Sequence, residues 1–144
     1  MSTTAPHSAV LEAAPLTPDE AARELFARLA MSTDPSDVHA DLAAGAGGFL
    51  VVDARSGEAY ARGHIPGAVS FPHRLITSES TAGLSREVVL VTYCDGVHCN
   101  ASTKAAWKLA RLGFRVKEMT DGLEGWCRDG FEVEVGAPSP RASP

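Results

Sequence analysis

The sequence of 144 residues predicts an α/β fold, in which helices cover both faces of a parallel sheet. Two continuous apolar runs, "GFLVV" at 48–52 and "VVLVTY" at 88–93, are typical of strands that are buried on both faces. Segments with helix caps and helical spacing alternate with these runs, and strands that alternate with helices need crossover connections. Ligands of such sheets bind beyond the carboxyl ends of the strands, so residues at those ends are candidates for function.

The first predicted helix lies in "LTPDEAARELFARLAM", residues 16–31. Thr17 is its expected N-cap, Pro18 takes the first helical position, and Glu20 completes a capping box. Apolar residues then recur at helical spacing: Leu25, Phe26 and Leu29.

The next elements follow closely. A second helix begins after Asp34 and Pro35 and ends at the glycines of 45–48. The run "GFLVVDAR" is a buried strand, and "GEAYARGHIPGAVSFP" contains a brief helix, a turn at Gly63 to Gly67 and a short strand.

The second half of the chain repeats the alternation. The strongest strand is "EVVLVTYC", and it is followed by the helix "ASTKAAWKLARLGF", which ends at Gly113. A strand in "RVKEM" and a last short helix in "DGLEGWCRDG" complete the pattern. Trp107 and Trp126 are expected in the core, and Cys127 is expected to pack beside Trp126.

Composition predicts one globular domain at 16–135, with a flexible leader at 1–15 and a disordered tail at 136–144. Thirteen basic against 18 acidic residues give a net charge of −5 without any basic run, so no nucleic-acid partner is expected. No signal peptide or membrane-length apolar stretch is visible, which predicts no membrane partner. The three cysteines are interpreted as thiols in a reducing cytoplasm.

Cys94 stands where the strongest strand ends, and a helix is expected to begin seven residues later. Helix N–H groups that point back at the loop favour an anion and lower the pKa of a cysteine there. Gly96 allows the backbone to curl into a nest of N–H groups. We therefore predict a cysteine nucleophile, Cys94, and the substrate-binding loop that follows it: Asp95, Gly96, Val97, His98, Cys99, Asn100 and Ala101. The alternative is a buried cysteine that serves only as a small apolar residue.

Three stretches resemble the rhodanese-like sulfurtransferases, over roughly residues 35–135. They are "VVDARSGEAYARGHIPGAVSFP", "VVLVTYC" with its glycine-bearing loop and helix, and "LARLGFRVKEMTDGLEGW". The resemblance implies a rhodanese-like α/β domain around a central parallel five-stranded sheet flanked by helices on both faces. It also implies that a persulfide on Cys94 carries a sulfane sulfur from a small donor to a thiol or cyanide acceptor, with a protein acceptor as an alternative.

The loop departs from the common pattern of this family. It has no arginine or lysine, and Asp95 is expected to oppose a dianionic donor such as thiosulfate. Related phosphatases need an arginine six positions after the cysteine, where this chain has Asn100, so phosphatase activity is not expected. Asp121–Gly122 replaces a familiar Gly-Gly, a change that we expect the fold to tolerate.

Two other functions remain open. The longer loop is compatible with a thiol-redox enzyme that resembles an arsenate reductase or handles persulfides. In such an enzyme Cys99 is a candidate resolving thiol for Cys94. The alternative is that Cys99 is only a loop residue. A non-catalytic binding or regulatory module is the other alternative, although the presence of Cys94 argues against it.

The remaining candidates have structural interpretations beside functional ones. His98 is either a cation that stabilises the thiolate or an exposed loop histidine. His64 is expected to hold a turn, and Asp53 and Arg55 are expected to tie the strand end to adjacent turns. No metal site is predicted, because Cys94 and Cys99 lack a second pair of ligands, and no cofactor is expected.

Overall fold

The computed structural model describes residues 3–139, so the predicted tail beyond 139 and the first two residues of the predicted leader lie outside the described residues. The chain divides into two compact units, Met1–Ala30 and Met31–Pro144. The predicted strands, the candidate cysteines and the loop between them all belong to the second unit.

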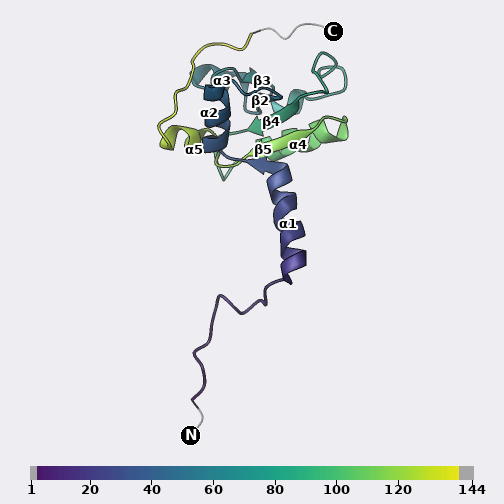
Figure 1. The fold of residues 1–144 in the computed structure, drawn as a ribbon. Helices are drawn as coiled ribbons and strands as arrows, with labels where there is room; N and C mark the ends of the chain where they lie inside the picture. The colour runs from purple at the N-terminus through teal and green to yellow at the C-terminus, as the bar shows by residue number, and fades with distance from the viewer. Residues whose placement is uncertain (1–2, 140–144) are drawn as a thin grey trace. The chain divides into compact units, whose positions relative to one another are not determined.

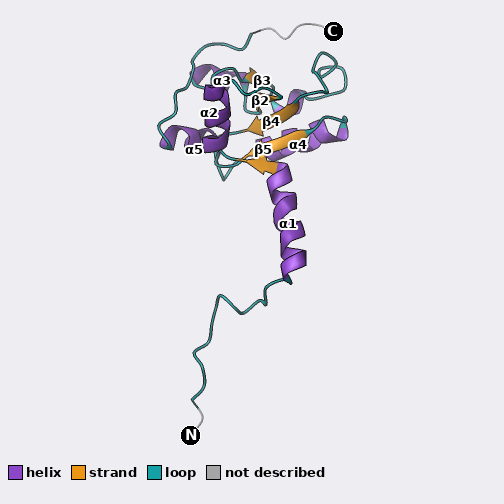
Figure 2. Cartoon of the chain, in the orientation of Figure 1, coloured by secondary structure: helices purple, strands orange, loops and turns teal. Residues whose placement is uncertain are grey.

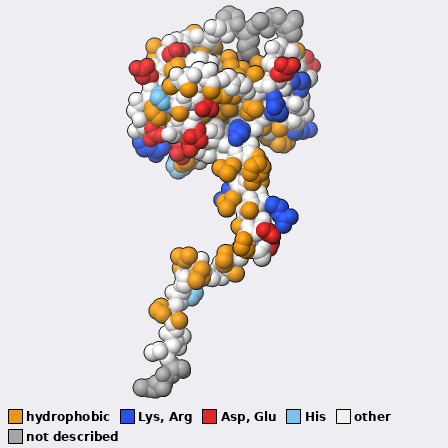
Figure 3. Space-filling view, viewed as in Figure 1, with side chains coloured by type: hydrophobic (Ala, Val, Ile, Leu, Met, Phe, Trp, Pro, Cys, Tyr) orange, Lys and Arg blue, Asp and Glu red, His pale blue; other side chains and the backbone are white. Residues whose placement is uncertain are grey.

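Most of helix α1, Pro18–Met31, belongs to the first unit, and it begins where the sequence predicts. The N–H of Glu20 donates to Thr17 Oγ1 at 3.3 Å, and the Thr17 hydroxyl donates to Glu20 Oε1 at 2.7 Å. This helix has no buried residue, and apolar side chains lie along its exposed surface in Figure 3. Phe26 is 70% exposed. No helix within residues 3–139 has the length and apolar character needed to cross a bilayer.

The second unit is built on a five-stranded parallel sheet, with the strand order β1-β5-β4-β2-β3. The strands are β1 (Ser32–Thr33), β2 (Phe49–Asp53), β3 (Val69–Ser70), β4 (Val89–Tyr93) and β5 (Val116–Met119). The central strand β4 pairs with β2 from Phe49–Val89 to Asp53–Tyr93, so both strands end at the same edge. The predicted parallel sheet and the number of strands implied by the family resemblance are confirmed.

Helices cover both faces of this sheet, as Figures 1 and 2 show. They are α2 (Pro35–Ala44), α3 (Gly57–Arg62), the 3₁₀ turn η1 (His73–Leu75), α4 (Ala101–Arg111) and α5 (Gly122–Arg128). Alternate strand residues enter two separate cores. Val51 and Val91 pack with Trp126 of α5 on one face, whereas Val52 and Leu90 pack with Leu109 of α4 on the other.

Two predictions about packing are wrong. Trp107 is 57% exposed, because it lies on the outer face of α4, where the Arg111 guanidinium stacks over its ring at 4.9 Å. The thiol of Cys127 is exposed, since α5 buries Trp126 and turns the next residue outward. The short strand β1 and the turn η1 were also missed, because a two-residue strand leaves no periodic pattern.

Candidate functional site

Cys94 follows the last residue of β4, at the carboxyl edge of the central strand. The N–H of Ala54 donates to the carbonyl of Tyr93 at 2.9 Å, which extends the pairing of β2 and β4 to this edge. Helix α4 begins at Ala101, seven residues after the cysteine, as predicted. The topology therefore places Cys94 where ligands of parallel α/β sheets bind.

The N-terminus of α5 holds the start of the loop. The N–H groups of Leu123 and Glu124 donate to the carbonyls of Cys94 and Asp95, each at 2.8 Å. Gly122 has φ +59°, and a Cβ there would lie 2.5 Å from the Cys94 carbonyl oxygen. Asp121 is also left-handed, with φ 65°, a conformation that aspartate adopts more readily than most residues.

The sulfur of Cys94 lies inside the loop, and the residue is only 2% exposed. Its Sγ is 3.2 Å from the carbonyl oxygen of Cys99 and 3.9 Å from that of Gly96, so both carbonyls are acceptors within reach of the single thiol hydrogen. Two carbonyl dipoles thus point at the sulfur. This arrangement stabilises a protonated thiol, whereas the N–H nest expected from the sequence would stabilise a thiolate.

Burial raises the pKa of the Cys94 thiol above its ordinary value. The hydroxyl and the backbone N–H of Ser102 lower this pKa in part, while a hydrogen bond to the Cys99 thiol and the charge on Cys99 raise it. The prediction of a lowered pKa is therefore wrong for this arrangement of the loop, because removal from water outweighs the donors at the start of α4.

Ser102 connects the sulfur to a carboxylate on the neighbouring strand, β5. Its Oγ lies 3.5 Å from Cys94 Sγ and donates to Glu118 Oε1 at 2.7 Å. Thr103 also donates to Glu118 Oε1, at 2.6 Å. A serine hydroxyl has a single hydrogen, so Ser102 must release Glu118 in order to donate to a thiolate, and Thr103 then still holds Glu118. Sequence reasoning missed Ser102 and Glu118, because the start of α4 brings Ser102 to Cys94 and the parallel pairing of β4 with β5 brings Glu118 to Ser102.

We expect Ser102→Ala to shift the pH dependence of any reaction at Cys94 to higher pH. The serine contacts lower the pKa of this thiol, so losing the hydroxyl reduces the thiolate fraction at neutral pH. The rate there should fall about tenfold, as for the loss of a hydrogen bond to a charged group, and should recover at high pH. Cysteine alkylation rates across pH measure this shift. Thr103→Ala is the matched control, and a shift of the same size in that variant would contradict the role of Ser102.

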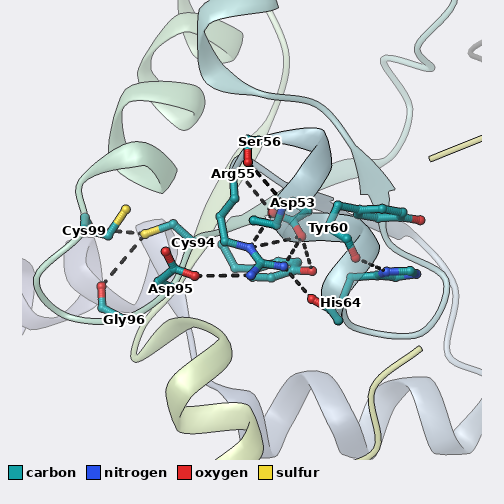
Figure 4. A network of polar contacts seen from close by, with 12 residues as sticks. Asp53, Arg55, Ser56, Tyr60, His64, Cys94, Asp95, Gly96 and Cys99 are labelled. Atoms are coloured by element: carbon teal, nitrogen blue, oxygen red, sulfur yellow. Dashed lines mark hydrogen bonds and ion pairs between the residues drawn. The ribbon is translucent and has the colours of Figure 1, made fainter. Parts of the chain in front are cut away.

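A buried ion pair supports the same edge from β2, as Figure 4 shows. Asp53, fully buried, accepts from Arg55 Nη2 at 2.7 Å and from the Tyr93 hydroxyl at 2.8 Å. Burial lowers the pKa of Arg55, but the hydrogen bonds and charge of Asp53 raise it further, so the net shift is upward. Arg55 also donates to the carbonyl of Gly63, at 2.7 Å. The expectation that Asp53 and Arg55 tie the strand end to adjacent turns is confirmed.

Arg55 makes a further contact that the sequence did not predict. Its Nη1 lies 3.2 Å from Asp95 Oδ1, and the Asp95 side chain is 62% exposed. The charge of Asp95 is therefore partly compensated at the point where it was expected to oppose an anionic donor.

The other predicted loop residues face different surroundings. Gly96 is buried against Glu124, whereas Val97, His98 and Asn100 are exposed. Cys99 is half-buried, and its N–H donates to the Gly96 carbonyl at 3.1 Å, which turns the chain back over Cys94. Ala101 is the first residue of α4.

His64 lies outside the loop. Its Nδ1 is 2.8 Å from the carbonyl oxygen of Tyr60, and its ring stacks on Tyr60 at 3.6 Å. The predicted structural role of His64 in the turn is therefore confirmed.

A cavity of about 340 Å³ opens beside the loop, between α3, η1 and the start of α4. Three arginines and one aspartate line it: Arg55, Arg62, Arg74 and Asp95. Its wall includes the half-buried Cys99, whereas Cys94 is not among the lining residues. Burial and the charges of Lys108, Lys104 and Arg74 lower the pKa of His73, another residue of the wall, so this histidine adds no charge at neutral pH. The cavity therefore favours an anionic molecule that reaches Cys99 first.

Within residues 3–139, no group of three or more His, Cys, Asp or Glu side chains is placed to hold a metal ion.

Comparison with known proteins gives one matching family model, the Rhodanese-like domain, over residues 34–129. Among curated proteins, the HTH-type transcriptional regulator Rv0324 of Mycobacterium tuberculosis is 36% identical over 93 residues, which are 65% of this chain and 41% of the regulator. The 3-mercaptopyruvate sulfurtransferase of Escherichia coli K12 is 32% identical over 104 residues, 59% of this chain and 37% of the enzyme. The chain thus spans about two fifths of the length of these curated relatives.

Among solved structures, the BH2092 protein of Bacillus halodurans is 46% identical to this chain, with a TM-score of 0.81. The match covers 83% of this chain and 87% of the BH2092 chain. A thiosulfate sulfurtransferase of Pseudomonas aeruginosa shares the fold, with a TM-score of 0.64 and 22% identity, over 85% of this chain and 23% of that protein.

Proposed function

This chain belongs to the rhodanese-like domain family, and on that premise we propose that it is a sulfurtransferase which carries a sulfane sulfur on Cys94. The Cys94 thiolate attacks the sulfane sulfur of a donor, a new S–S bond forms on Cys94, and the donor leaves with the electron pair of its broken bond. A small thiol, cyanide or a protein thiol then takes the sulfur from the persulfide. Neither a cofactor, a nucleic acid nor a membrane is part of this proposal.

One observation carries the proposal: a cysteine sulfur at the carboxyl edge of the central strand, with the Ser102 hydroxyl at 3.5 Å. The position lets a substrate reach the loop from outside the sheet, and the hydroxyl supplies a donor to the thiolate. Three free thiols in residues 3–139 are compatible with a reducing compartment, and we propose the cytoplasm.

A regulatory module is the second candidate function. It is favoured by the similarity to a protein named as a transcriptional regulator, and by the protonated, buried state that the loop favours for Cys94. In that role the domain would respond to a sulfur donor or an oxidant without rapid turnover.

The test is the intact mass of the protein after separate exposure to thiosulfate, mercaptopyruvate and glutathione persulfide. With a competent donor, the chain should gain the mass of one sulfur atom immediately after mixing, and repeated cycles with cyanide should produce thiocyanate. Cys94→Ser should gain nothing, while Cys127→Ser, which removes an exposed thiol elsewhere, should behave as the unaltered chain.

Uptake without turnover would favour the regulatory module. Sulfur on the Cys94→Ser variant, or no uptake from any of the three donors, would contradict the proposed carrier.

A further inference from the structure

Cys94 and Cys99 meet inside the loop. The Cys94 sulfur lies 3.2 Å from the Cys99 carbonyl oxygen, and the two thiols are close enough for each to affect the ionisation of the other. Figure 4 shows the two sulfur atoms as neighbours. The turn from Gly96 to Cys99 produces this contact, because its hydrogen bond of 3.1 Å folds the chain back on itself.

The two cysteines differ in their access to solvent. Cys94 is 2% exposed and is absent from the cavity wall, whereas Cys99 is half-buried and lines the cavity beside three arginines. Arg55 forms ion pairs with Asp53 and Asp95. The other two arginines of the cavity, Arg62 and Arg74, have no carboxylate partner in the described part of the chain. A small anionic thiol in the cavity therefore meets Cys99 before it meets Cys94.

We propose that Cys99 is a resolving thiol, which releases the sulfur of the Cys94 persulfide as hydrosulfide and leaves a Cys94–Cys99 disulfide that a small anionic thiol reopens from the cavity. The proposal rests on the proposed function, since it requires sulfur on Cys94. It adds a second activity, reduction of sulfane sulfur, to transfer of that sulfur.

The steps balance without a cofactor. The Cys99 thiolate attacks the inner sulfur of the persulfide, the bond between the two cysteine sulfurs forms, and the S–S bond to the outer sulfur breaks. The outer sulfur leaves with the bonding pair, takes up a proton and becomes hydrosulfide; it is reduced while Cys99 is oxidised. A small thiol then attacks the Cys99 sulfur and frees Cys94 as a thiolate, and a second small thiol reduces the mixed disulfide.

The test is a single loading with a donor found competent by intact mass, after which the excess donor is removed and no reductant is added. The unaltered chain should release about one hydrosulfide per chain and yield a peptide that contains the Cys94–Cys99 disulfide. Per sulfur atom that it has taken up, Cys99→Ser should release less than about a tenth as much hydrosulfide, because attack by a neighbouring thiol is lost. Cys127→Ser is the matched control and should release hydrosulfide as the unaltered chain does.

The outcomes separate the two proposals. Persulfide that persists as long in the unaltered chain as in Cys99→Ser overturns the resolving role while sulfur transfer stands. If no variant takes up sulfur, the proposed function fails. Mild peroxide then tests Cys99 without a sulfur donor, because it oxidises Cys94 to a sulfenic acid, and attack of the Cys99 thiolate on that sulfur forms the same disulfide. Recovery of Cys94 as sulfinic acid with Cys99 still free would overturn the resolving role.

The class of the reductant has its own test on the disulfide form. At equal thiolate concentration and low salt, 3-mercaptopropionate should reopen the disulfide about tenfold faster than cysteamine, because arginines attract the carboxylate. Arg62→Gln and Arg74→Gln should reduce this ratio, and added salt should do the same. Equal rates for the two reductants would show that the cavity does not select an anionic thiol.

Discussion

Replacement of Asp53 with alanine is expected to lower the free energy of unfolding by about 3–5 kcal/mol, because it leaves a buried guanidinium without its partner. Asp53 is fully buried and Arg55 is 8% exposed, so water cannot replace the lost carboxylate. The Tyr93 hydroxyl loses its acceptor in the same variant. A loss of this size is a large fraction of the 5–15 kcal/mol typical of whole domains, and urea unfolding measures it.

Asp95→Ala is the matched control for this prediction, since it removes the other carboxylate bound by the same arginine. The Asp95 side chain is 62% exposed, so its loss should cost less than about 1 kcal/mol. Equal destabilisation by the two variants would mean that the buried position of Asp53 does not matter, contrary to our interpretation.

Gly122→Ala is expected to reduce sulfur transfer about a hundredfold, because it displaces the loop that carries Cys94. Its Cβ would lie 2.5 Å from the Cys94 carbonyl oxygen and 2.6 Å from the Gly96 nitrogen, and backbone atoms there cannot rotate away. The left-handed φ of +59° adds about 1–2 kcal/mol of strain for alanine. Activity and urea unfolding, measured together, report the two effects.

Gly130→Ala separates backbone strain from displacement of the loop. Gly130 is also left-handed, at φ +81°, but a Cβ there would have no atom within 4 Å. This variant should lose about 1–2 kcal/mol of stability and keep its activity. Equal loss of activity in both glycine variants would show that strain alone, and not the contact with the Cys94 loop, is responsible.

Most of the fold could be predicted from local patterns. Helix starts at Pro18 and Pro35 follow from their capping residues, and the hydrogen bonds of Thr17 and Asp34 confirm both. The strand at Val89–Tyr93 followed from an apolar run, and the place of Cys94 followed from where that run stops. These features depend on residues that are close together in the sequence, so they can be predicted from the sequence alone.

The packing of single side chains was less predictable. A tryptophan is usually buried, yet Trp107 lies on the exposed face of α4, where only the arrangement of the helix against the sheet decides burial. The same reasoning failed for Cys127. Residue type alone does not record which side of a short helix faces the core.

The sequence by itself determined the order of the longer helices and strands, the position of Cys94 after the central strand and the family resemblance. The tertiary structure alone decided the surroundings of the sulfur. Ser102 meets Glu118, and Arg55 meets Asp95, across 16 and 40 positions of the chain. The direction of the Cys94 pKa shift was predicted wrongly from the helix that follows, because burial of the thiol outweighs the donors at the helix N-terminus. Burial and the orientation of distant dipoles are properties of the packed chain, and no local pattern specifies them.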